Sequence, residues 1–212
     1  MSDLFAGFRE LPGYGTAAVL VLLLYAAEAE LRFGARARAT QPGAADRNSS
    51  RLLKLATAVA VLAFVLAMKA NSPAFIPFLP DWFRGAVLPG LPMIAWVGIA
   101  VATLGLLLRL WSVLTLRDRY SRTLLVHQDH VIERSGPYRW VRHPGYLGSL
   151  LVFNGVALAS GNWVTFLVSF AVILSAYIYR IKAEDEMLVA QLGFPYAEYR
   201  RQVRALIPTI PR

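Results

Sequence analysis

A short polar stretch, Arg142-His143-Pro144-Gly145-Tyr146-Leu147-Gly148, stands directly before a long apolar run. Pro144 and Gly145 interrupt the backbone there, so peptide N–H groups at the start of the following helix are left without helical partners and can face an anionic group. Histidine is also a side chain that takes up a proton near neutral pH. We therefore predict an active site where this run begins.

A second polar stretch, Arg180-Ile181-Lys182-Ala183-Glu184-Asp185-Glu186, follows the same apolar run. Arg180 lies one helical turn before Glu184, which makes an ion pair geometrically natural. A solvated helix end with ordinary ion pairs is an equally simple interpretation. If the apolar run folds back on itself, however, this stretch and His143 emerge at the same face.

The segment Gly136-Pro137-Tyr138-Arg139 between the two is a turn signal, because proline fixes φ and glycine adopts conformations closed to other residues. Arg139, Arg142 and His143 also fit a basic cluster at a membrane edge. Their grouping with two tyrosines at an interrupted helix start favours a binding site instead.

The composition is that of an integral membrane protein. Of 212 residues, 57% are hydrophobic and 17% charged, and the mean hydropathy is +0.48. The chain has no cysteine and three histidines, so thiolate chemistry is excluded and we predict no metal site. The net charge of +9 comes from basic residues at the ends of apolar segments, which points to membrane headgroups and not to nucleic acid.

Apolar segments of about the length that crosses a bilayer predict an all-α, polytopic protein with about five crossings. The stretch 146–179 is uncharged and too long for one crossing, so we interpret it as a helical hairpin that turns at Ser160-Gly161-Asn162. The other predicted crossings are Thr16–Leu31, Leu52–Ala70 and Leu91–Leu116.

Most of the basic residues fall between the first and second crossings, between the third and fourth, and after the fifth. The positive-inside rule then predicts an outside N-terminus, a cytoplasmic C-terminus and a cytoplasmic active site, in the inner membrane if the source is bacterial. The first fifteen residues lack the pattern of a cleaved signal peptide. We expect residues 71–90 to be interfacial, and 196–208 to form a lid over the site or an inert interfacial helix.

Together these blocks resemble the isoprenylcysteine carboxyl methyltransferase family, which is related to the phospholipid methyltransferases. The resemblance covers roughly residues 105–210. Besides the three stretches above, it rests on Leu188, Gly193, Tyr196, Tyr199 and Ile207-Pro208. It implies S-adenosylmethionine as methyl donor and a lipophilic or lipidated acceptor, with residues 91–212 as the methyltransferase core and 1–90 as an N-terminal pair of helices.

The resemblance also implies site residues. The acidic pair here is Glu184-Asp185, where the family more usually has a second Glu. The catalytic assignments are Arg180, Glu184 and His143. The cofactor-binding assignments are His130, Gly136, Pro137, Tyr138, Arg142, His143, Pro144, Tyr146, Gly148, Glu184 and Asp185.

Methyl transfer from a sulfonium needs alignment and electrostatics more than acid–base chemistry. A carboxylate acceptor requires no general base, and Arg180 could bind it with two hydrogen bonds. An amine or thiol acceptor would have to lose a proton, to His143 or to an acid. The sequence leaves these acceptors open.

Two other functional classes are less well supported. Sterol-reductase relatives that use a reduced nicotinamide cofactor share the His-Pro pair, but Gly145 and Gly148-Ser149 stand where those proteins typically have Asn and Gly-Glu. A non-enzymatic protein that binds anionic lipid would not need the spaced His143, Arg180 and Glu184. The oligomeric state is open, because the small residues Gly98, Ala102 and Gly105 could pack within one chain or between chains.

Overall fold

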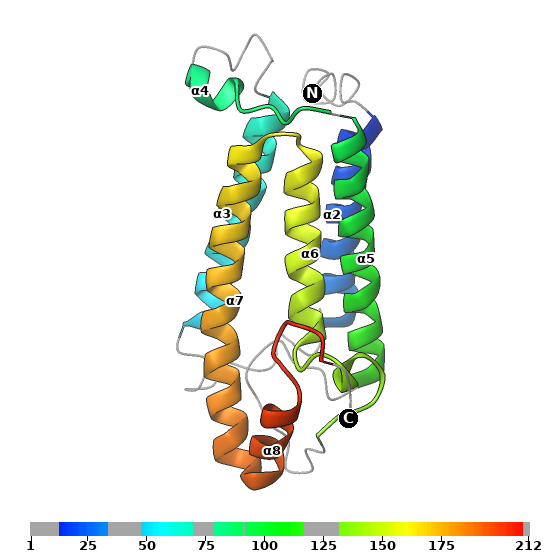
Figure 1. Ribbon diagram of the computed structural model, residues 1–212, viewed down its shortest axis with the longest axis vertical. Coiled ribbons are helices and arrows are strands. Elements are labelled where there is room, and N and C mark those ends of the chain that lie inside the picture. Colours follow the sequence, from blue (N-terminus) through cyan, green and yellow to red (C-terminus); the bar gives the residue numbers. More distant parts are fainter. Residues whose placement is uncertain (1–12, 34–47, 70–78, 91, 117–131, 210–212) are drawn as a thin grey trace.

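The computed structural model is a bundle of helices (Figure 1). It describes residues 13–33, 48–69, 79–90, 92–116 and 132–209. The α-helices are α2 (Gly13–Phe33), α3 (Ser49–Lys69), α4 (Asp81–Arg84), α5 (Met93–Leu116), α6 (Pro144–Ala159), α7 (Trp163–Leu192) and α8 (Phe194–Gln202), and a 3₁₀ helix, η4, spans Gly136–Arg139. Among the described residues β-structure is limited to an isolated bridge between Val87 and Asn162. The predicted all-α class is therefore confirmed.

Each predicted apolar segment is a helix. In the described part of the chain, α3, α5 and α7 are long and apolar enough to cross a membrane, and shorter apolar helices cover 15–27 and 144–159. Large apolar side chains on these helices, such as Leu62, Leu107 and Leu167, point outward. The protein is integral to the membrane, as predicted. That α2 and α6 also cross it stays a prediction. Helix α6 has 16 residues and is only about 24 Å long, and the apolar part of α2 covers only Gly15–Ala27.

The predicted hairpin is formed by α6 and α7, and its turn lies at Ser160-Gly161-Asn162 as expected. Gly161 has a φ of 68°, which glycine adopts without strain. The Asn162 side chain accepts a hydrogen bond from the Thr165 N–H at 3.0 Å and so caps α7. It also donates to the Phe83 carbonyl at 2.8 Å, which attaches α4 to this end of the bundle. Of the loop predicted to be interfacial, residues 71–78 lie outside the described residues.

Helices α5 and α6 pack with their backbones in contact. A Cβ on Gly105 would lie 2.6 Å from the Gly148 carbonyl oxygen, and one on Gly155 would lie 2.5 Å from the Ala102 nitrogen. The small residues of α5, Gly98 included, thus pack within one chain. Gly148, which the resemblance assigned to the cofactor, belongs to this helix contact: a side chain there would collide with α5.

Helix α7 runs antiparallel to α3 and continues past the apolar part of the bundle (Figure 1). Thr165, near the start of α7, donates to the Ala63 carbonyl late in α3. Arg180, fifteen residues further along α7, reaches Ser49 at the start of α3. The polar end of α7 therefore lies beside the first turn of α3, and its Glu184 contacts Tyr146 in the first turn of α6, as the hairpin requires.

Candidate functional site

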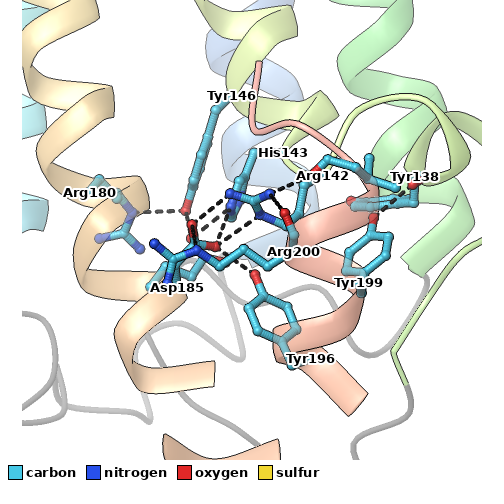
Figure 2. Close-up of polar contacts among 11 residues, drawn as sticks. Tyr138, Arg142, His143, Tyr146, Arg180, Asp185, Tyr196, Tyr199 and Arg200 are labelled. Carbon is cyan, nitrogen blue, oxygen red and sulfur yellow. Dashed lines mark hydrogen bonds and ion pairs between the residues drawn. The ribbon is translucent and has the colours of Figure 1, made fainter. Parts of the chain in front are cut away.

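Asp185 is the centre of a buried polar cluster at the α8 end of the bundle (Figure 2). Its carboxylate accepts two hydrogen bonds from Arg142, from Nε at 3.1 Å and from Nη2 at 2.7 Å. The Tyr196 hydroxyl donates to Oδ1 at 2.7 Å, and Nε2 of His143 lies 3.1 Å from the same oxygen. Because the carboxylate is saturated with donors, its charge is compensated within the protein.

Arg142 also fastens the C-terminal tail. Its Nη1 donates to the carbonyls of Arg200 and Val203, at the end of α8, where helical carbonyls lack partners. The backbone N–H groups of Arg142 and His143 donate to the carbonyls of Arg204 and Ala205 at 2.9 and 3.0 Å. The tail after α8 is thereby paired with the chain that leads into α6.

Tyr146, Arg180 and Glu184 form a second group beside Asp185. The Tyr146 hydroxyl donates to Oε2 of Glu184 at 2.6 Å and accepts from Nε of Arg180 at 3.0 Å. The His143 ring stacks on the Tyr146 ring, with centroids 5.4 Å apart and planes 7° apart. Tyr146 thus links Arg180 to Glu184, the two residues predicted to lie one helical turn apart on α7.

The two acids differ in access. Nδ1 of His143 is 3.9 Å from Oε2 of Glu184, whose side chain is 23% exposed. The Asp185 side chain is only 4% exposed and is held on several sides. Glu184 is therefore the acid that a ligand can reach, whereas Asp185 braces the residues around it.

Two tyrosines of α8 complete the cluster from the tail side. Burial and the negative charge of Asp185 raise the pKa of Tyr196 far above its usual value, so its hydroxyl keeps the proton that it donates. Burial likewise raises the pKa of Tyr199 to about 12, and this hydroxyl donates to the Tyr138 carbonyl at 2.7 Å. Tyr196 thus connects α8 to α7, and Tyr199 connects α8 to the region before α6.

Gly136, Pro137 and Tyr138 lie in η4, against the end of α5. Gly136 has a φ of 53°, and a Cβ there would meet the Thr115 side chain at 2.9 Å. The Tyr138 hydroxyl shares a 2.7 Å hydrogen bond with Ser112 of α5. These contacts place the turn beside the cluster without directing the Tyr138 side chain toward Asp185.

The structure brings together most of the residues assigned from the sequence. Those in one connected cluster are Arg142, His143, Tyr146, Arg180, Glu184 and Asp185. Pro144 is fully buried as the first residue of α6. His130 lies outside the described residues.

Several residues around the cluster were not assigned to the site from the sequence. Tyr196 and Tyr199 were expected only in the lid segment, although their spacing after Gly193 was a usable signal. Arg200, with Nε 3.7 Å from Oδ2 of Asp185, looks in the sequence like any other surface arginine. Ser49 contacts Arg180. Nothing in the sequence indicates this contact, because Ser49 lies many residues before the region that resembles the family.

Within the described residues, no group of three or more His, Asp and Glu side chains is placed to hold a metal ion. The polar cluster instead offers hydrogen-bond donors and acceptors with a stacked aromatic pair, at the end of an apolar bundle. Such a site can bind a polar ligand beside one that arrives from a lipid phase.

The chain is similar to several known proteins. The sequence profile of the isoprenylcysteine carboxyl methyltransferase (ICMT) family matches residues 96–190. The protein-S-isoprenylcysteine O-methyltransferase of Schizosaccharomyces pombe is 35% identical over 85 residues, 40% of this chain and 36% of that protein. The enzyme of the same name from Tribolium castaneum is 32% identical over 138 residues, 58% of this chain and 45% of that protein. The resemblance to this family is confirmed.

A different name occurs among the relatives: the cobalt-zinc-cadmium resistance protein CzcN of Cupriavidus metallidurans is 34% identical over 131 residues, 61% of this chain and 54% of that protein. Among solved structures, the eukaryotic intramembrane Ras methyltransferase ICMT matches with a TM-score of 0.56 and 24% identity, over 74% of this chain and 52% of that one. This structure shows the fold. The chain spans about a third to a half of the lengths of the first two relatives.

Proposed function

We propose that this chain is a membrane methyltransferase that transfers the methyl group of S-adenosylmethionine to the carboxylate of an isoprenylcysteine-type, lipophilic acceptor. The observation that carries the proposal is the Arg180–Tyr146–Glu184 group, which sets a cation and an accessible acid side by side at the end of an apolar bundle. The match of the family profile to residues 96–190 supports the same reaction.

The acidic and aromatic side chains fit the polar parts of the methyl donor. Glu184 is accessible and negatively charged, which suits the ammonium or the ribose hydroxyls of the cofactor. The stacked rings of His143 and Tyr146 form an aromatic wall next to it. When bound, the cofactor supplies a methyl group that is activated by a positively charged sulfur.

Arg180 is the residue that we assign to the acceptor. Its guanidinium is almost fully buried and already donates to Tyr146 and Ser49, so it would act on the carboxylate as a nearby positive charge that draws one oxygen toward the methyl carbon. The new bond forms between that oxygen and the methyl carbon while the bond from carbon to sulfur breaks, so the carboxylate and sulfonium charges both disappear. No proton moves, and no general base is needed.

An amine acceptor, as on a phospholipid headgroup, is the second candidate within the same superfamily. It would have to lose a proton, and Asp185 is poorly suited to take it because Arg142 and Tyr196 already occupy its oxygens. The proton would then have to go to His143 or Glu184, whereas a carboxylate acceptor needs no proton transfer and is the simpler candidate.

The placement in the membrane follows from the charges. We propose that the α8 end of the bundle faces the cytoplasm, because the basic segments of the chain flank this end. Residues 91–212 would form the methyltransferase core and residues 1–90 an N-terminal unit that supports it. Membrane lipids surround both.

A transfer assay tests the proposal. Detergent-purified protein receives S-adenosylmethionine with a labelled methyl group and one of three acceptors: a farnesylated cysteine derivative with a free carboxylate, its carboxamide analogue, or phosphatidylethanolamine. We expect label only on the carboxylate, as a base-labile ester. Label on the phospholipid amine would establish the second candidate, and no label on any acceptor would refute the proposal.

A further inference from the structure

Two serines at the start of α3 contact the cation of the candidate site. Nη1 of Arg180 donates to Oγ of Ser49 at 2.9 Å and to Oγ of Ser50 at 3.0 Å. Ser49 is fully buried, and Arg180 is 2% exposed. Both serines lie in the N-terminal helices, well before the region that matches the family profile.

The packing of α3 on α7 makes this contact rigid. Ala56 and Ala60 of α3 lie in one apolar cluster with Ile173, Ala176 and Tyr177 of α7. These side chains are small or fully buried, so the two helices are held close just before Arg180. The first turn of α3 therefore cannot shift along α7 without disturbing this cluster.

Arg180 is fixed from two sides as a result. Nε is directed at the Tyr146 hydroxyl, 3.0 Å away, while Nη1 is directed at the two serines. Because the guanidinium is planar, hydrogen bonds in two different directions fix the orientation of its plane. Without the serines, a long and flexible side chain would keep only the Nε contact among these three.

We infer that Ser49 and Ser50 are positioning residues, which hold the Arg180 guanidinium, and so its positive charge, in place for the acceptor carboxylate. The inference rests on the proposed function. It gives the N-terminal helices a part in the reaction, through α3, and it predicts that the serines act on turnover of the acceptor and not on the cofactor.

The test compares wild type with the double variant Ser49→Ala/Ser50→Ala. Ser169→Ala is the matched control, because Ser169 is a fully buried serine of α7 that donates to the Phe153 carbonyl, far from the cluster along the chain. Ser50→Thr keeps the hydroxyl at one position. For each protein the readouts are kcat and KM for the farnesylcysteine acceptor, the Kd for S-adenosylmethionine and the melting temperature in detergent.

We expect kcat/KM for the acceptor to fall between about tenfold and a hundredfold in the double alanine variant, because a reacting group is misplaced. The Kd for the cofactor should stay within about twofold of wild type, as should all values for Ser169→Ala, and Ser50→Thr should retain most of the activity. In an Arg180→Lys background, the two alanines should cause little further loss, since their effect acts through the guanidinium.

Three outcomes would overturn the inference. Wild-type kinetics in the double variant would show that the serines do not matter, and an equal loss in Ser169→Ala would show that any buried hydroxyl has the same effect. A full additional loss in the Arg180→Lys background would show that the serines act by another route. A wild type that methylates no acceptor would refute the proposed function itself, which is a distinct result.

Discussion

The guanidinium of Arg142 and the carboxylate of Asp185 face each other edge to edge inside the protein, joined by hydrogen bonds of 3.1 and 2.7 Å. Because Arg142 precedes α6, Asp185 lies on α7 and Arg142 also binds the carbonyl of Arg200 on α8, this one pair joins three helices. Both side chains are buried, and the pair holds these helices together. Its neighbours Glu184 and Arg180 are the residues that we assign to ligands.

Asp185→Asn should destabilise the protein. Removing one charge of a buried pair leaves Arg142 uncompensated, at a cost of about 3–5 kcal/mol. A melting temperature measured in detergent should fall by about 6–20 °C, since about 1 kcal/mol corresponds to 2–4 °C in a chain of this size. Glu198→Gln is the control, because Glu198 contacts Arg201 and Gln202 at the surface of α8. Equal melting temperatures for both variants would contradict the assignment of Asp185 as a brace.

Glu184→Gln should have the opposite effect: it should weaken cofactor binding and leave the stability of the protein almost unchanged. The side chain is partly exposed, so the melting temperature should change little, whereas the affinity for S-adenosylmethionine should drop about tenfold or more as a charge-assisted contact is lost. Calorimetric titration gives the Kd. A variant that binds the cofactor as tightly as wild type would remove Glu184 from the cofactor site.

Tyr146→Phe removes the hydroxyl between Arg180 and Glu184 but keeps the ring that stacks on His143. We expect kcat to fall about tenfold while the protein stays folded, because the two charged side chains lose their common partner. Tyr199→Phe is the matched control: it also loses a buried hydroxyl, which donates to the Tyr138 carbonyl. If both variants lose the same activity, the Tyr146 hydroxyl has no special role in the site.

Gly105→Ala should disrupt the contact of α5 with α6. The added methyl group would lie 2.6 Å from the Gly148 carbonyl oxygen and 2.8 Å from the Val152 nitrogen, both of which are backbone atoms that cannot turn aside. Overpacking of this kind costs about 1–3 kcal/mol. Leu104→Ala changes the neighbouring, outward-facing residue and should have a smaller effect on the melting temperature in detergent. A Gly105→Ala variant as stable as wild type would contradict the close packing.

The sequence was sufficient for the helices and for the hairpin, because both depend on local signals. The uncharged run and the Ser-Gly-Asn turn signal are visible in the sequence itself. The turn is stabilised because the Asn162 side chain caps α7. That His143, Arg180 and Glu184 lie together was also predicted, from their positions at the two ends of that hairpin and from the family resemblance, and the structure brings them together. Their chemical roles stay predictions.

Contacts between distant segments could not be predicted in the same way. Whether Arg142 faces a ligand or Asp185 depends on how α7 and α8 pack. The residues near Arg142 in the sequence do not indicate this packing. Gly148 is assigned to the cofactor because it stands in a motif, and this assignment stays a prediction. No local pattern shows that its lack of a side chain is required by the approach of α5. The contact of Ser49 with Arg180 spans 131 residues and leaves no local pattern.

The most direct test of the central claim is a calorimetric titration of detergent-purified protein with S-adenosylmethionine, beside parallel titrations with its demethylated product and with NADPH. The account predicts saturable binding of the first two, lost in Glu184→Gln, and no binding of the nicotinamide. Saturable binding of NADPH alone would contradict the account and identify the protein as a reductase.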